Sequence, residues 1–376
     1  MHAQPRGLCG PGGQAQILEG DDQMTIRRSP DPVAKMPNSS AREPASALQT
    51  LGWVAITAVY FLILVGGTVR ATGAGMGCPD WPLCFGQWIP PVHESQLPSN
   101  WREIYANRGY ATAPFDATKT WIEYINRLVG ASIGLLIIAF VAVCSRYRRI
   151  DPPVFWVAVI ALIAVGFNGW LGSQVVSSNL KPVVISLHMA GAFFVQMALI
   201  YATTRASRAG FVAEVRGVLP TWFRNLLLFT MGALIVQIIL GLQIRESIDW
   251  ISRSMTGAER DQWIALVPQI FYVHRSFSWV ILGLACLLVW KIFKSRLRRT
   301  LLGRSAMVLV GLIVFEMLLG GALNHLDFPA VAQPLHLLAA HLIFGVLWFQ
   351  WCVLSVSRDP AGTEFSSPTT NRNSYV

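Results

Sequence analysis

Eight runs of about 20 mostly apolar residues are the feature that most restricts how this chain can fold. A helix of about 20 residues crosses about 30 Å of hydrocarbon. Charged residues make up 13% of the chain, whereas a soluble domain has about 25%. The sequence therefore predicts an all-α integral membrane protein with eight transmembrane helices. The expected spans lie near 49–69, 121–144, 153–173, 182–203, 222–243, 269–292, 303–323 and 334–356.

Four polar positions inside these spans recur at a fixed interval. Asn126 and His188 lie 62 residues apart, and His274 and His336 repeat that interval 148 residues later. Flanking segments match too: 123–127 with 271–275, 171–172 with 319–320, and 65–70 with 240–245. The chain is therefore predicted to hold one four-span module twice, as two parallel pseudo-symmetric four-helix bundles.

The predicted organisation has two halves and two tails. The halves are residues 48–206 and 207–357. Residues 1–47 are rich in Gly, Pro and mixed charge without apolar periodicity, which predicts a disordered cytoplasmic tail. Residues 358–376 are expected to form a polar C-terminal tail.

Basic residues predict the orientation in the membrane. The loops after the second, fourth and sixth spans carry three, three and five Lys or Arg, counting Lys291 at the end of the sixth span, whereas those after the third and seventh carry one and none. Positive loops stay in the cytoplasm, so both termini are expected there and the four polar positions near the outer face. The net charge of +10 is explained by anchoring against anionic lipid and needs no nucleic acid.

The residue types at the repeated positions predict haem sites. His274 and His336, on facing helices, would form an iron site that a haem can fill. In the first half His188 faces Asn126, whose amide is a poor iron ligand. Glu123 shares a helix face with Asn126, and a charge in lipid is costly unless paired or protonated, so it is a functional candidate.

Each of these residues also has a purely structural alternative. A membrane histidine can simply pair with a neighbouring helix. Glu123 can be an interfacial carboxylate near a helix start. Arg127 and Arg275, adjacent to the ligand positions, can reach haem propionates or the lipid headgroups.

Cys78 and Cys84 lie six residues apart in the long loop after the first span. In an oxidising compartment such a pair is expected to form a disulfide. It would either staple the loop or serve as a redox-active dithiol. Both alternatives remain open from the sequence.

Several separated motifs together resemble haem A synthase over residues 48–356. They are Gly-Met-Gly-Cys-Pro-Asp-Trp-Pro-Leu-Cys at 75–84, Glu-Tyr-Ile-Asn-Arg at 123–127, the segment around His188, Val-His-Arg at 273–275 and Gln-Pro-Leu-His at 333–336. The resemblance implies a membrane haem-dependent oxidoreductase. Such an enzyme oxidises the C8 methyl of haem O to the formyl group of haem A, the prosthetic group of terminal oxidases.

The resemblance also implies roles for particular residues. His274 and His336 match the ligands of a haem B in the second half, and His188 matches a histidine of the substrate half, where haem O becomes haem A. Glu123 matches an essential glutamate. Asn126 departs from the histidine of many relatives, and a second cysteine pair found in some members is absent from the sequence.

The implied setting is a bacterial plasma membrane. The implied partners are the lipid bilayer, haem O synthase, a membrane electron donor and oxidase assembly factors, with a homo-oligomer as one option. Two other classes compete with the enzyme: a dihaem cytochrome that oxidises quinol, and a transporter built from parallel repeats. Asn126 argues against symmetric electron transfer, and the ligand spacing argues against transport.

Overall fold

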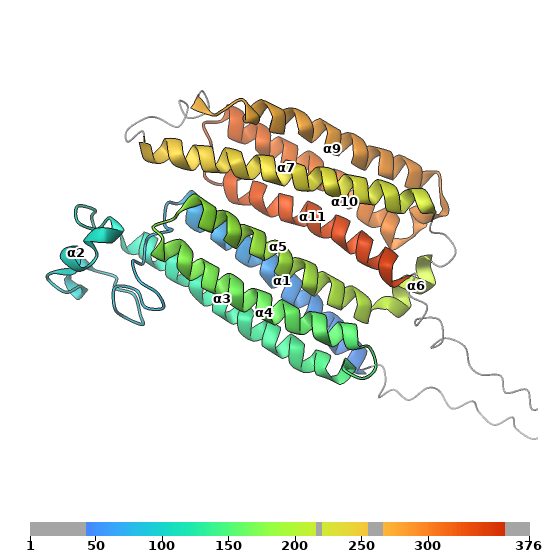
Figure 1. Cartoon of the computed structure of the whole chain (residues 1–376), viewed down its shortest axis with the longest axis horizontal. Helices are drawn as coiled ribbons and strands as arrows, with labels where there is room; N and C mark the ends of the chain where they lie inside the picture. Colours follow the sequence, from blue (N-terminus) through green and yellow to red (C-terminus); the bar gives the residue numbers. More distant parts are fainter. Residues whose placement is uncertain (1–42, 216–219, 255–265, 358–376) are drawn as a thin grey trace, which may run out of the picture. The chain divides into compact units, whose positions relative to one another are not determined.

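The fold comes from a computed structural model that describes residues 43–215, 220–254 and 266–357. Within these residues eight helices are long and apolar enough to cross a membrane (Figure 1). They are α1 (Glu43–Ala71), α3 (Ala117–Cys144), α4 (Pro152–Ser177), α5 (Pro182–Ala206), α7 (Thr221–Ser254), α9 (Ile270–Phe293), α10 (Leu301–His325) and α11 (Ala332–Val356). The predicted all-α membrane fold is confirmed. The predicted tails fall largely outside the described residues.

Seven helices begin and end within six residues of the predicted spans, and α7 is the exception. It continues to Ser254, eleven residues past the expected end at 243. The extension carries Arg245 and Asp249, which end the apolar run without ending the helix. Their side chains pair one turn apart at 3.3 Å, which favours the helical conformation.

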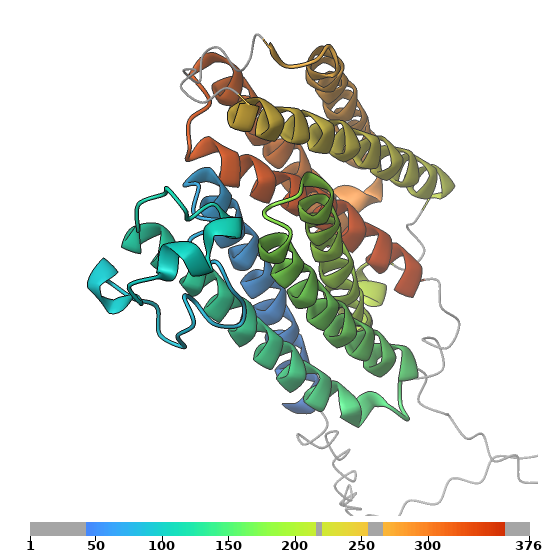
Figure 2. The same cartoon turned by 60° about the vertical axis from the view of Figure 1, so that its left-hand side comes forward.

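The helices pack as two sets of four. In the first set α3 and α5 are diagonal, since each packs on α1 and α4; in the second, α9 and α11 are diagonal, since each packs on α7 and α10 (Figures 1 and 2). A separate cluster of buried apolar side chains centres on each set. The diagonal helices are those predicted to carry the haem ligands. The pseudo-symmetry of the two sets stays a prediction.

Helix α11 packs against α1 and α5 and so joins the two sets. A buried amide lies in this contact: Nε2 of Gln196 donates to the hydroxyl of Tyr60 and to the backbone oxygen of His341, each at 2.9 Å. The His341 ring stacks on Phe193 with centroids 3.8 Å apart. His341 is thus a buried contact between the halves.

All of α3, α5, α9 and α11 begin at one end of the helices, and we call it the loop end because the segment between α1 and α3 lies there (Figure 1). Two arginines that occupy matching positions in the repeat meet one carboxylate at this end. Asp249 lies 2.5 Å from Arg70 and 3.3 Å from Arg245. Its side chain is 15% exposed, so solvent screens these pairs only in part.

We expect Asp249→Asn to lower the stability of the protein. The change leaves two guanidinium groups close together without their shared counter-charge, at a cost of about 1–3 kcal/mol. The measurement is thermal unfolding in detergent. Glu94→Gln is the matched control, because the Arg102–Glu94 pair has side chains 41% and 51% exposed and contributes less. Equal melting shifts in the two variants would contradict the prediction.

Candidate functional site

The four repeated polar positions lie near the loop end, on the two diagonal pairs of helices. Asn126 on α3 and His188 on α5 belong to the first set, and His274 on α9 and His336 on α11 to the second. Each lies within the first three turns of its helix. The structure therefore places both members of each pair at the same end of their bundle, on two helices that lie diagonally across it.

Each histidine ring lies against a glycine of a neighbouring helix. A Cβ atom added to any of these glycines would lie 3.1–3.5 Å from the Cε1 atom of the ring. The pairs are Gly172 with His188, Gly241 with His274, and Gly320 with His336. The missing side chain lets the Cε1 edge of the imidazole approach the helix backbone closely, and this limits the directions in which the ring can point.

Two of the rings have an oxygen beside Nδ1. For His188 it is the backbone oxygen of Asn168, at 3.0 Å, and for His336 it is Oε2 of Glu316, at 3.2 Å. The contact of His188 is a hydrogen bond, and when Nδ1–H is held in this way, Nε2 keeps the lone pair that binds a metal. Nδ1 of His274 and Nδ1 of His336 make no hydrogen bond among the described residues, although Nδ1 of His336 lies at ion-pair distance from Glu316.

The two diagonal pairs differ in their donor sets. Oδ1 of Asn126 is buried, has no partner in the described part of the chain, and faces Gly66 at the position that matches Gly241. No group of three or more His, Cys, Asp or Glu that could hold a free metal ion occurs among the described residues. A haem does not need such a group, because the porphyrin supplies four of the iron ligands and the protein one or two. The histidines therefore fit a haem better than a free ion.

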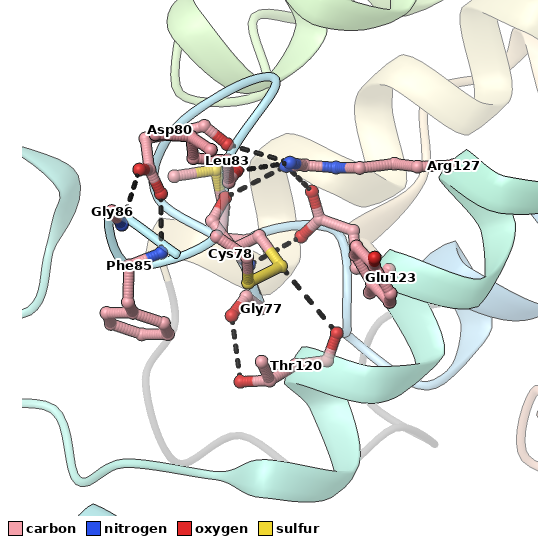
Figure 3. Close-up of a disulfide and its surroundings, with 12 residues drawn as sticks. Gly77, Cys78, Asp80, Leu83, Phe85, Gly86, Thr120, Glu123 and Arg127 are labelled. Atoms are coloured by element: carbon pink, nitrogen blue, oxygen red, sulfur yellow. Dashed lines mark hydrogen bonds and ion pairs between the residues drawn. A yellow bond between two sulfur atoms is a disulfide. The ribbon is translucent and has the colours of Figure 1, made fainter. Parts of the chain in front are cut away.

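Glu123 is 3% exposed and lies under the loop (Figure 3). Its Oε2 accepts a hydrogen bond from the backbone N–H of Cys78 at 2.9 Å, and its Oε1 pairs with Arg127 at 2.5 Å. Glu123 precedes Asn126 by three residues, so both lie on one face of α3. The carboxylate is thus buried and paired, and it connects the loop to the helix face that carries Asn126.

Arg127 ties down the same loop. Its guanidinium donates to the backbone oxygens of Asp80, Leu83 and Cys78, at 2.8, 2.9 and 3.2 Å (Figure 3). The loop lies directly on α3, since a Cβ atom added to Gly77 would lie 2.3 Å from a backbone oxygen of the helix. The haem contact predicted for Arg127 is not tested by the structure, in which the side chain contacts the loop.

Arg275, at the matching position in the second half, has a different environment. Its guanidinium lies 5.4 Å from the ring centroid of Tyr272 and 6.0 Å from that of Phe271. The side chain is exposed. Its predicted haem contact stays a prediction.

The loop has a small core of its own. Cys78 and Cys84 form the predicted disulfide, and both are 0% exposed. Edge-to-face aromatic contacts surround Phe85, from Trp101, Tyr105, Tyr110 and Phe115. This burial fits a staple, because thiol exchange needs an accessible sulfur.

The hydroxyl of Tyr110 donates to the backbone oxygen of Met76. Burial raises the pKa of this phenol far above its ordinary value, and the nearby carboxylates of Glu123 and Asp80 raise it further. Tyr110 therefore stays protonated at any physiological pH. It remains a donor that fixes the loop beside Glu123.

We expect Cys78→Ser to loosen the loop. A disulfide that closes so short a segment contributes about 2 kcal/mol, and its loss also frees the backbone N–H that holds Glu123. The measurements are thermal unfolding and protease cleavage within residues 72–116. Cys286→Ser, at an exposed free cysteine, is the control. If stability and turnover are both unchanged in Cys78→Ser, the disulfide has neither of the two roles considered for it.

The sequence reasoning missed Asn168 and Glu316. Both lie 20 residues before a candidate ligand and 148 residues apart, so the repeat itself was the signal that could have found them. Glu316 is in addition an acidic residue inside an apolar span, which is rare enough to single it out.

Comparison with known proteins gives consistent matches. The COX15-CtaA family model, described as "Cytochrome oxidase assembly protein", matches residues 49–348. A Shewanella oneidensis protein is 31% identical over 191 residues, which are 50% of this chain and 54% of that protein. A Shouchella clausii protein is 25% identical over 84% of this chain and 98% of its own length. A Flavobacterium johnsoniae protein is 22% identical over 77% of this chain and 93% of its own length. All three are named heme A synthase.

Proposed function

The chain belongs to the COX15-CtaA family of cytochrome oxidase assembly proteins, and on that premise we propose that it oxidises the C8 methyl group of haem O to the formyl group of haem A. Its relatives place it in haem A biosynthesis as a membrane oxidoreductase. The haem dependence, the two sites and the residue roles below are parts of the proposal.

The second half is proposed to hold haem B between His274 and His336. The supporting observations are the two imidazoles on diagonal helices, their glycine contacts, and the oxygen beside Nδ1 of His336. A haem held by both histidines would supply electron storage and transfer and would leave oxygen no ligand position. The residues of this chain would orient the two imidazole rings and exclude water from the haem.

The first half is proposed to bind the substrate, haem O. His188 would bind it from α5, while the amide of Asn126 leaves the other side weakly ligated. Glu123 lies three residues from Asn126, and its position is held by Arg127 and by the N–H of Cys78. We assign it proton transfer, or stabilisation of positive charge that develops at the methyl carbon.

The reaction balances as two hydroxylations followed by loss of water. Each hydroxylation consumes one O₂, two protons and two electrons from a membrane reductant, adds one oxygen atom to the carbon and releases the other as water. Water then leaves the doubly hydroxylated carbon to give the aldehyde. The loop end is proposed to face outward in a bacterial plasma membrane, with both termini in the cytoplasm, because the basic loops lie at the opposite end. Haem O synthase, oxidase assembly factors and a second copy of this chain are the proposed partners.

The observation that carries the proposal is the difference between two matching positions, Asn126 in the first half and His274 in the second. Extraction of pigments from the purified protein tests it. We expect haem B together with haem O, a hydroxylated intermediate or haem A. Haem B alone would identify an electron-transfer cytochrome, and a colourless protein would favour a transporter.

A further inference from the structure

Glu316 is an acidic residue in the middle of the α10 span, and its side chain has a specific neighbour. Its Oε2 lies 3.2 Å from Nδ1 of His336, with the two side chains 18% and 28% exposed. This is a hydrogen-bonding distance. Neither atom makes a hydrogen bond among the described residues, with the other or with a third group, so the two lie at ion-pair distance without an aligned hydrogen bond. A charged group inside a membrane is costly unless it is partnered, so the contact accounts for the presence of the carboxylate.

The first half has a neutral contact at the same place. Asn168 precedes His188 by 20 residues, as Glu316 precedes His336. Nδ1 of His188 lies 3.0 Å from the backbone oxygen of Asn168. A Cβ atom added to Gly191 would lie 2.3 Å from Oδ1 of the Asn168 side chain. His188 therefore has a backbone carbonyl alone beside Nδ1, whereas His336 has the carboxylate of Glu316 in addition to the backbone of that residue.

We propose that Glu316 is a positioning residue that acts through His336 to lower the reduction potential of the haem in the second half. The inference rests on the proposed function, since it takes His336 as an iron ligand. A small rotation of either side chain would let Oε2 of Glu316 accept the Nδ1 hydrogen, and that hydrogen bond would fix the tautomer in which Nε2 binds the metal. A carboxylate partner also makes the imidazole more basic than a carbonyl does.

A more basic axial ligand favours the oxidised iron, and hydrogen bonding to ligands is one of the means by which proteins set haem potentials. A lower potential in the second half favours release of electrons toward the first. The first half has Asn168 where the second half has Glu316. This difference gives the two haems different reduction potentials, although the ligand positions of the two bundles match.

The test is a redox titration of the purified protein with its haem bound. Glu316→Gln keeps the shape and removes the charge, and Glu316→Asn installs the residue that the first half has at this position. We expect both to keep the low-spin spectrum while the haem binds its electron about tenfold more tightly, a rise of about 59 mV. Glu246→Gln, the same change at an exposed carboxylate on α7, is expected to have no effect.

An unchanged potential in both Glu316 variants, with haem B still present, contradicts the role of Glu316 and leaves the proposed function standing. A wild-type protein that contains no haem B contradicts both. Loss of haem from folded Glu316→Gln, while Glu246→Gln retains it, supports the contact, because a ligand without its hydrogen-bond partner binds metal about 10–100-fold more weakly.

Discussion

Replacing His336 by Ala is expected to abolish the low-spin haem spectrum of the purified protein. The proposed site supplies two protein ligands, so removal of one opens an axial position and converts the iron to high spin or releases it. Haem content should fall by roughly tenfold or more, since removal of a residue that only hydrogen-bonds to a metal ligand already weakens metal binding by about that factor. The measurements are the visible spectrum and the haem-to-protein ratio. His274→Ala should give the same result.

The matched control is His325→Ala. His325 is an exposed histidine at the end of α10, near the same end of the bundle, and its ring contacts Asn324 at 3.0 Å. This change should leave the spectrum intact. If His336→Ala retains a low-spin haem, or if His325→Ala loses it, the assignment of the iron ligands is wrong.

The spans and the ligand positions could be predicted because both depend on local sequence. Length and apolarity fix a transmembrane helix, and an interval of 62 residues that occurs twice identifies matching positions without knowledge of contacts. The end of α7 could not be predicted in this way. Its last turns are polar, and Asp249 there pairs with Arg70, 179 residues earlier in the chain.

The environment of Arg127 shows a second limit of the sequence. The repeat matches it to Arg275, yet Arg127 is enclosed by loop carbonyls, while Arg275 is exposed and lies near aromatic rings. The difference arises from the extra residues between Arg70 and Asn126, which have no counterpart in the second half. A sequence match between the two halves predicts the position of the backbone. It does not predict the partners of a side chain, because these also depend on loops that only one half contains.

The largest functional effect is expected at Glu123. The Gln side chain has nearly the same shape, and its amide oxygen can still accept the N–H of Cys78, so Glu123→Gln removes the charge with little change to the loop. We expect haem A formation to fall by about 10²–10⁴-fold, the usual contribution of a positioned acid or base. Haem B should remain, because His274 and His336 lie in the other half. Quantification of haem A per haem B in cells and in purified protein is the measurement.

The difficulty is that Glu123 also pairs with Arg127, at 2.5 Å, so a structural defect could imitate a chemical one. Two controls separate these causes. Asp116→Asn changes a carboxylate at the N-cap of the same helix, where Asn caps equally well, and should retain activity. Arg127→Gln removes the partner of Glu123 and three loop contacts but leaves the carboxylate in place. If Glu123 acts in the chemistry, Glu123→Gln should be less active than Arg127→Gln while its thermal stability is higher. The reverse order of activities would assign Glu123 to holding the loop.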